Sequence, residues 1–325
     1  MAVTARKAST PETAEPAVVF VQGPSRLPAP PKGDAGVVVL DVAFASGDSF
    51  DRVTEPFIQT LGSRLLLWCD HHEHPLGWAR YQSDPRFLLV PNRLAHACPE
   101  LITPETVRRI GKPGCLFVHA DLDGVLTAAK LLRGGIEAWP GADEDARAVD
   151  SPGRGHALSR WGEELALAID EALAVFTAGE RRDFLKALVF GLAAGTLPAE
   201  LSEKVEQSAE RSREARKAAE SVASACGRAE LGGLFVIRVA GRRKGRERKT
   251  LLRYAEERAK IGVVVEEDAV SGHAWLTAAT FDEEADLGDV SGLEGGRSDF
   301  RGAESPSGAR AFADILQRLS SLARR

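Results

Sequence analysis

The chain has 325 residues, of which 44% are hydrophobic and 27% charged, a composition typical of a folded soluble protein long enough for two domains. Its formal net charge of -5 provides no general attraction to nucleic acid or to anionic membranes, so any polyanion must be recognised by a local basic patch. No apolar run approaches the ~20 residues that span a bilayer, and the N-terminal segment lacks the layout of a secretory signal. We therefore expect a cytoplasmic protein with no membrane association.

The first 35 residues are rich in Pro, Ala, Thr and Ser, and their only apolar stretch is 17–21. A segment of this composition buries too little surface to order itself, so residues 1–35 predict a flexible tail. The four cysteines form no Cys-x-x-Cys pair and lie mostly in apolar runs: Cys69, Cys98, Cys115 and Cys226. They predict reduced, strand-packed thiols in a reducing compartment.

A different pattern begins at Gly36. Short apolar runs rich in β-branched or bulky residues predict strands buried on both faces, at 37–40, 65–69 and 115–118. Helical patterns separate these strands, at about 50–61, 104–110 and 125–132. Strands that alternate with helices predict an α/β domain with a parallel sheet, which we assign to residues 36–158.

From residue 159 the apolar period becomes helical. Patterns at 161–176, 184–192 and 202–225 predict a helical connector over 159–230, with a last helix that stands partly in solvent. A second, smaller α/β domain follows over 231–325. Its predicted elements are strands at 234–239, 261–265 and 273–280, helices at 249–260 and 308–322, and a glycine-rich turn at 292–302.

Polar residues follow each of the three strands predicted for the first domain. Their positions are Asp41, then Asp70-His71-His72, then the run His119-x-Asp121-x-Asp123-Gly124. Each aspartate alone would be explained as a turn former or helix cap. Because ligands bind beyond the carboxyl ends of strands in parallel sheets, we expect one cluster. Its mixture of carboxylate and imidazole suits an octahedral divalent ion such as Mn2+, or Mg2+ with retained waters.

The last of these motifs has a geometry of its own. If the third strand continues through it, His119, Asp121 and Asp123 project to the same side, because alternate residues of an extended segment share a face. Gly124 would then let the chain turn into a helix that begins at Val125. The helix N-terminus favours nearby anions.

Asp-His-His after one strand and His-x-Asp-x-Asp-Gly opening a helix after another resemble the DHH phosphoesterase superfamily. That superfamily includes nanoRNases (oligoribonucleases), linear-dinucleotide phosphodiesterases, single-strand exonucleases and family II inorganic pyrophosphatases. The family's usual order is His/Asp/Asp, lone Asp, Asp-His-His. Here the lone Asp41 comes first and the His/Asp/Asp motif last, as in a circularly permuted domain. We therefore expect strand 115–118 to lie between, or directly beside, the strands that end at Asp41 and Asp70.

The resemblance implies a site with two divalent ions, Mn2+ above all. His119 and Asp121 would bind one ion, His71 and Asp123 the other, and Asp41 would bridge them. Asp70 would orient an imidazole, and His72 would face the substrate phosphate as a charge stabiliser or proton donor. The family has one further aspartate ligand, for which Asp150 is the best candidate and Asp143, Asp145 and Asp84 are alternatives. His74, beside the motif, is better explained as part of its loop.

The C-terminal region resembles the substrate-binding DHHA1 domain, whose glycine-rich motif usually reads Gly-Gly-His followed by small residues. Here residues 295–302 read Gly-Gly-Arg-Ser-Asp-Phe-Arg-Gly. The resemblance implies substrate contacts from Gly295, Gly296, Arg297 and Arg301. The dense basic segment 242–249 is either a solvated loop or a phosphate clamp that uses Arg243 and Arg246.

The leading hypothesis is a Mn2+-dependent phosphodiesterase that hydrolyses short oligonucleotides or linear dinucleotides to nucleoside monophosphates. A phosphomonoesterase acting on 3'-phosphoadenosine nucleotides and a non-catalytic nucleotide-binding regulator are alternatives. Inorganic pyrophosphatase activity is less favoured because the C-terminal region resembles the DHHA1 type. We expect no long nucleic acid as partner, since aromatic residues are only 6% of the chain and provide few stacking platforms. A homodimer is left open.

Overall fold

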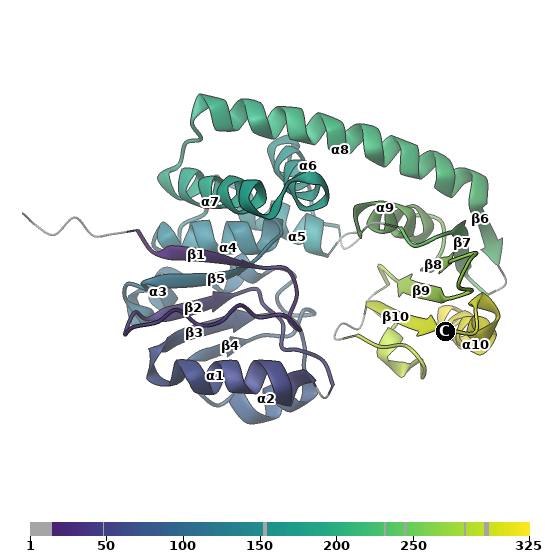
Figure 1. The fold of residues 1–325 in the computed structure, drawn as a ribbon, viewed down its shortest axis with the longest axis horizontal. Coiled ribbons are helices and arrows are strands. Elements are labelled where there is room, and N and C mark those ends of the chain that lie inside the picture. Colours follow the sequence, from purple (N-terminus) through teal and green to yellow (C-terminus); the bar gives the residue numbers. More distant parts are fainter. Residues whose placement is uncertain are drawn as a thin grey trace, which may run out of the picture.

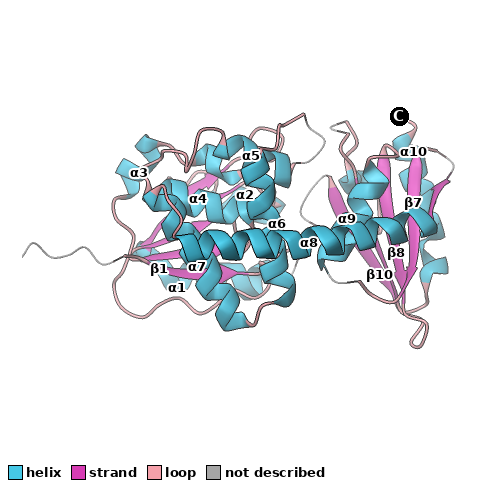
Figure 2. Ribbon diagram, turned by 90° about the horizontal axis from the view of Figure 1, so that it is seen from above, coloured by secondary structure: helices cyan, strands magenta, loops and turns pink. Residues whose placement is uncertain are grey.

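The structure, a computed structural model, describes residues 15–47, 49–151, 155–230, 232–243, 245–282, 284–295 and 299–325. Two α/β units lie side by side, and the long helix α8 (Ala199–Cys226) runs along both of them (Figures 1 and 2). Each unit is built around its own five-stranded sheet. The α/β fold class with a second, smaller α/β unit is confirmed.

The first sheet is entirely parallel. Its strands lie in the order β1 (Ala17–Val21), β5 (Cys115–His119), β2 (Val37–Leu40), β3 (Leu65–Asp70) and β4 (Phe87–Leu89). The strand that ends at His119 lies directly beside the strand that leads into Asp41, as expected, while β2 separates it from the strand that ends at Asp70. The carboxyl ends of β5, β2 and β3 therefore meet at one edge of the sheet.

The prediction of a flexible tail through residue 35 is wrong for residues 17–21, which form strand β1. Residues 17–21 pair in register with β5, and Val18 and Val21 are buried in the cores on opposite faces of the sheet. A short segment that docks on an existing sheet edge needs much less apolar surface than a segment that must fold by itself. The carbonyl of Val21 also accepts the N–H of Ala120 at 2.9 Å, which fixes the chain just before Asp121.

Alternate residues of the central strands enter two different hydrophobic cores. Val37 and Val39 pack on the face covered by α1 (Glu55–Leu61), while Val38 and Leu40 pack on the other face. The remaining helices of this unit are α2 (Pro75–Tyr81), α3 (Pro104–Ile110), α4 (Leu122–Leu132), α5 (Ala142–Asp150), α6 (Arg160–Val175) and α7 (Ala178–Ala194). Shorter turns of helix occur at Phe50–Thr54, Gly62–Arg64 and Cys98–Leu101. Burial on both faces explains why the strands read as continuous apolar runs.

The predicted helical connector is shorter than expected. Leu165 and Ile169 of α6 and Leu188 of α7 belong to the same hydrophobic core as Val125 of α4, so these two helices complete the first unit. Only α8 connects the units. Its 28 residues are highly charged, and among the described residues no helix is both long and apolar enough to cross a membrane.

The second sheet is mixed. Its order is β10 (Phe300–Ser305), β9 (Ala274–Ala279), β8 (Ile261–Glu267), β7 (Leu234–Ala240) and β6 (Gly227–Glu230), with only β7 and β8 parallel. Two longer helices accompany it, α9 (Gly245–Glu256) and α10 (Ala313–Ala323), with 3-10 turns at Leu287–Asp289 and Ala309–Phe312. Strand β6 begins inside the predicted connector, and β10 begins inside the predicted glycine-rich turn. Edge strands of mixed polarity carry too weak an apolar pattern to be predicted.

One buried carboxylate joins the two units. Glu171 of α6 is 3% exposed and forms ion pairs with Arg211 of α8 and Arg246 of α9. The Arg211 Nε–Glu171 Oε1 distance is 3.2 Å. Since α6 belongs to the first core and α9 covers the second sheet, this contact holds α9 against the sheet edge that carries the motifs.

The assignment of residues 17–21 to the sheet predicts that Val21→Ala is costly. Val21 is 1% exposed, so the substitution should lower the free energy of unfolding by roughly 1–3 kcal/mol. The matched control is Val270→Ala, at a valine that is 98% exposed, which should have no measurable effect. Urea unfolding of both variants tests this. Equal, negligible effects would mean that residues 17–21 behave as a tail.

Candidate active site

Asp41 lies directly after β2 in an unusual backbone conformation. Its φ is 57°, and it is the one non-glycine residue with a positive φ in the described part of the chain. Its N–H donates to the carbonyl of Cys69 at 2.8 Å, which ties the end of β2 to β3. A non-glycine residue in this region of φ/ψ space costs about 1–3 kcal/mol, so the surrounding structure must impose it. Such strain marks Asp41 as a residue placed for function.

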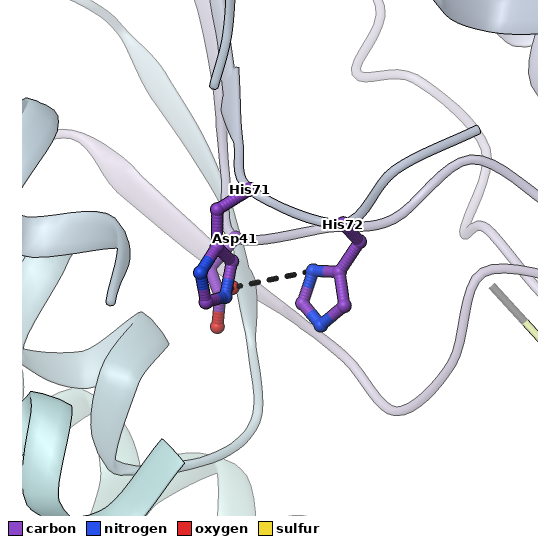
Figure 3. A group of neighbouring side chains, drawn as sticks. All are labelled: Asp41, His71 and His72. Carbon is purple, nitrogen blue, oxygen red and sulfur yellow. Dashed lines mark ion pairs between the residues drawn. The ribbon is translucent and has the colours of Figure 1, made fainter. Parts of the chain in front are cut away.

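The Asp41 carboxylate is buried among imidazoles. It is 1% exposed, and within the described ranges neither of its oxygens accepts a hydrogen bond. Imidazole nitrogens approach it at longer distances: His119 Nδ1 at 3.3 Å, His71 Nε2 at 3.6 Å and His72 Nδ1 at 3.8 Å. Figure 3 shows both rings of the His71-His72 pair beside this carboxylate. A buried carboxylate without donors requires a compensating cation.

His71 is fully buried, and a backbone carbonyl orients its ring. Its Nδ1 lies 3.0 Å from the carbonyl of Ala95, so this nitrogen carries the proton that donates to the carbonyl. Its Nε2 then presents a lone pair to the cluster. That atom lies 3.5 Å from Asp123 Oδ2 and 3.5 Å from Asp150 Oδ2. A backbone carbonyl that fixes the tautomer in this way is typical of metal-binding histidines.

His72 is oriented by a different group. Its Nδ1 lies 2.8 Å from Oδ1 of Asp70, and Asp70 itself is 1% exposed. The His72 side chain keeps 18% of its surface exposed. This is the arrangement expected for Asp70 as an orienting carboxylate, with the His72 ring at the wall of a cleft.

The third strand does not continue through the His-x-Asp-x-Asp-Gly motif, which was the condition for an extended geometry, and the helix begins before Val125. Strand β5 ends at His119, Asp121 is the N-cap of α4, and Asp123 lies in the first helical turn. Asp121 accepts the N–H of Gly124 at 2.9 Å, which satisfies one donor of the helix N-terminus. Gly124 is required there because a Cβ at this position would lie 2.3 Å from the carbonyl oxygen of His119.

Backbone and hydroxyl donors hold Asp123. The N–H of Cys98 lies 3.0 and 2.9 Å from its two carboxylate oxygens, and Thr127 Oγ1 donates to Oδ1 at 3.1 Å. These supporting groups, like the carbonyl of Ala95, were not predicted from the sequence. No residue type marks a backbone N–H or carbonyl, so only the folded chain reveals them.

The carboxylates and imidazoles form two groups that can each hold a metal ion, with ligand atoms within 4.8 Å of one another. One group is Asp41, His119 and Asp121; the other is His71, Asp123 and Asp150. Asp41 also groups with His71 and His72, so it lies between the two. These are the sets of ligands that the resemblance implies for two ions.

Among the aspartates considered for the last ligand, only Asp150, at the end of α5, lies in these groups. The others have different partners: Asp143 pairs with Lys130, Asp145 accepts the N–H of Ser159, and Asp84 pairs with Arg86. His74 caps α2 by accepting the N–H of Gly77 at 3.0 Å and stacks on Phe50, so it supports the loop.

The electrostatics of the cluster favour a bound cation. Burial and the neighbouring Asp121 carboxylate raise the pKa of Asp41 to about 7. Burial and Asp41 likewise raise the pKa of Asp123 well above its usual range. Burial opposes protonation of His119, but the carboxylates of Asp121 and Asp41 raise its pKa well above its usual value. Burial is the largest cause of both raised aspartate pKa values, and the charges of neighbouring carboxylates add to it, so a bound cation would stabilise the ionised form of both. Four carboxylates and two imidazoles fit a hard divalent cation.

A cleft of about 400 Å³ opens over the cluster between the two units. His72, His119, Asp121, Asp123 and Asp150 line it from the first unit. The facing wall includes the basic side chains Arg216 of α8 and Arg246, Lys249 and Arg253 of α9, together with Phe281 and Phe300. The facing wall also contains Glu256 and Asp299, so its four basic side chains outnumber two acidic ones, and this excess suits a substrate that carries phosphate.

The basic segment divides into residues with different roles. Arg246 lines the cleft but pairs with Glu171. Arg243 is not among the residues that line it, and its guanidinium donates to Glu247 at 3.0 Å and to the carbonyl of Ala240 at 3.2 Å. Lys249 lines the cleft, and its charge helps to lower the pKa of Asp121. Sequence analysis did not single out Lys249, because its position on a helix face becomes clear only once α9 is known to begin at Gly245.

The predicted contacts from the glycine-rich motif are described only in part. Gly296 and Arg297 lie outside the described residues. Gly295 has a φ of 144°, and its carbonyl accepts Arg301 Nη1 at 2.8 Å. Arg301 is therefore directed to this turn, while Phe300 beside it lines the cleft.

No protein-family model and no curated protein sequence matches this chain. Among solved structures, it is similar to a pGpG-specific phosphodiesterase, PggH from Vibrio cholerae, with 11% identity over 78% of each chain and a TM-score of 0.47. It is also similar to an exopolyphosphatase-related protein from Bacteroides fragilis, with 11% identity over 89% of this chain and 73% of that chain and a TM-score of 0.44. These values do not identify a family for the chain.

The unsatisfied Asp41 carboxylate predicts opposite effects for two buried aspartates, each 1% exposed. Asp41→Asn should leave the metal-free protein at least as stable as wild type, since asparagine tolerates the positive φ and removes a repelled charge. Mn2+ should raise the melting temperature of wild type by roughly 5 °C or more at saturation, and Asp41→Asn should abolish that rise.

The control, Asp145→Asn, should behave in the reverse way. Asp145 accepts hydrogen bonds from Ser159 Oγ at 2.7 Å and Trp139 Nε1 at 3.0 Å, so the variant should lose stability and keep the Mn2+ response. Thermal unfolding with and without Mn2+ measures both variants. An undiminished Mn2+ response in Asp41→Asn would contradict the assignment.

Proposed function

We propose that the chain is a two-metal phosphodiesterase that hydrolyses short oligonucleotides or linear dinucleotides to nucleoside monophosphates. One observation carries this proposal. Two sets of carboxylate and imidazole ligands, one on each side of Asp41, lie at the floor of a cleft whose other wall carries lysine and arginine. The Asp70-His71-His72 and His119-x-Asp121-x-Asp123-Gly124 motifs, which resemble those of DHH phosphoesterases, support the same conclusion.

The proposed ligands are His119 and Asp121 for one ion and His71, Asp123 and Asp150 for the other, with Asp41 shared. When bound, two divalent ions of the Mn2+ or Mg2+ type supply charge neutralisation for the phosphate and a water whose pKa falls towards ~7. The buried ligands are preorganised for this task, because Cys98, Thr127 and Ala95 fix Asp123 and His71 through hydrogen bonds.

His72 is proposed to act on the leaving group. Its Nδ1 is hydrogen-bonded to Asp70 and its ring lines the cleft, so contact with the substrate is assigned to Nε2. The Asp70 carboxylate stabilises the imidazolium form, which can donate a proton to the departing oxygen or neutralise its charge. This assigns Asp70 an orienting role.

Lys249 is proposed to bind substrate phosphate from the facing wall. Its positive charge acts to lower the pKa of both Asp121 and Asp170, which line the same cleft. The ammonium group of a lysine in this place can bind a non-scissile phosphate, or an oxygen of the scissile phosphate, as a positive point charge. Gly295, Gly296, Arg297 and Arg301 are proposed as further substrate contacts, as the resemblance of the glycine-rich motif implies.

The first test of this proposal uses a substrate panel. Purified protein with Mn2+ should hydrolyse pApA and a 5-mer RNA in preference to a 24-mer RNA, phosphoadenosine phosphate and pyrophosphate. Asp123→Ala should reduce hydrolysis at least ~100-fold, because a metal ligand is lost. Chromatographic detection of nucleoside monophosphates measures both. Preferred cleavage of phosphoadenosine phosphate would favour the monoesterase alternative, and wild-type activity in Asp123→Ala would contradict the mechanism.

The second test compares two basic residues of the same segment. Lys249→Ala should raise KM for pApA roughly tenfold or more, the loss of one charge-assisted contact of ~1.5–3 kcal/mol. Arg243→Ala is the matched control and should leave KM unchanged, since its guanidinium is engaged by Glu247 and the Ala240 carbonyl. If only the Arg243 variant raised KM, the phosphate clamp would lie at the start of the segment and not on α9.

A further inference from the structure

Phe300 stands out among the large apolar side chains of the second unit. It is 43% exposed, yet it lines the cleft that also contains His119, Asp121 and Asp123. Most other phenylalanines described are buried or packed into the hydrophobic cores. Exposure of an aromatic ring to water is unfavourable, and a ligand that covered the ring would remove this unfavourable exposure.

The position of Phe300 is fixed by the second sheet. It is the first residue of β10, and it pairs in register with Ala279 of β9. The N–H of Thr280 donates to the carbonyl of Asp299 at 3.0 Å, which closes the ladder at the cleft. Phe281 follows directly on the β9 side and lines the same cleft. Two aromatic rings therefore border it from neighbouring strand ends.

The rest of the cleft also combines apolar side chains with the polar ones described above. Leu158, Leu167 and Leu252 line it, and so does Val149, which is 36% exposed. A substrate made only of phosphate, such as pyrophosphate or polyphosphate, has no group to place against these side chains. A nucleotide has both parts, because its phosphate suits the acidic and basic walls and its base presents a flat apolar face.

We propose that Phe300 forms a nucleobase-binding subsite, where the ring stacks on the base of a nucleotide whose phosphate lies at the metal cluster. This inference depends on the proposed function for the identity of the substrate, and it adds the group that is recognised. Stacking on an aromatic face is tolerant of base identity, since every base has a π-face. The subsite therefore selects nucleotides over non-nucleoside phosphates without selecting a sequence.

The test compares binding of AMP and of ribose 5-phosphate, which differ by the base alone. Calorimetric titration in the presence of Mn2+ would use wild type, Phe300→Ala, Phe300→Leu and Phe300→Trp. Wild type should bind AMP more tightly than ribose 5-phosphate. Phe300→Ala should weaken AMP binding at least about fivefold and leave ribose 5-phosphate binding unchanged. Phe300→Trp should retain AMP affinity, and Phe300→Leu should lose most of it.

Val270→Ala is the control for loss of an exposed apolar side chain elsewhere in the second unit, and it should match wild type for both ligands. Equal binding of AMP and ribose 5-phosphate by wild type would overturn the subsite. An equal loss of both ligands in Phe300→Ala would do the same, because it would indicate a role in folding or in phosphate binding. Hydrolysis of pApA by wild type is measured separately. Its failure with the AMP preference intact would remove the proposed function and keep the subsite.

Discussion

Electrostatic repulsion among buried carboxylates is the constraint on which the rest of this structure depends. Asp41 is 1% exposed, and its carboxylate receives no hydrogen bond from the described residues. Burial and the charge of Asp121 oppose its ionisation, and its own charge opposes the ionisation of Asp123. Folding such a cluster is unfavourable unless a cation joins it. The chain nevertheless holds Asp41 in a left-handed conformation, with its N–H on the Cys69 carbonyl. Backbone strain and charge repulsion at the same residue indicate that the carboxylate of Asp41 has a function.

The scaffold around this point has two tasks. The parallel sheet brings the ends of β5, β2 and β3 to one edge, and β1 buttresses β5 from the outer side. The second unit provides what the first lacks, since Lys249 and Phe300 both line the cleft from elements that pack around the other sheet. Glu171 connects the two units through its ion pairs with Arg211 and Arg246. The relative position of metal ligands, basic side chains and aromatic ring therefore depends on the packing of α6, α8 and α9.

Sequence alone predicts much of this arrangement for clear physical reasons. The strands at 37–40, 65–69 and 115–118 are buried on both faces, so their apolar runs are unambiguous. The polar residues that follow them had to meet at one edge once the sheet was parallel. What the sequence could not show depends on partners distant in the chain. Strand β1 is recognisable only beside β5, and the place of helices α6 and α7 in the first unit is clear only from their packing against α4.

The site shows the same division. Motif spacing predicted the neighbours of Asp41, but the helix was expected to begin at Val125 and begins at Leu122, because Asp121 caps it. Asp150 could not be separated from Asp143 and Asp145 by spacing, and only their different partners distinguish them. Lys249 and Phe300 gave no separate signal, since a charged helix face and an edge strand resemble ordinary surface in a sequence.

The central claim is that Asp41 lies between two divalent ions. Anomalous diffraction from crystals grown with Mn2+ tests it most directly, because it locates manganese without reference to activity. The account predicts two anomalous peaks ~3.5–4 Å apart, one beside His119 and Asp121 and the other beside His71, Asp123 and Asp150, with Asp41 in contact with both. A single peak that does not touch Asp41, or none at this edge of the sheet at saturating Mn2+, would contradict it.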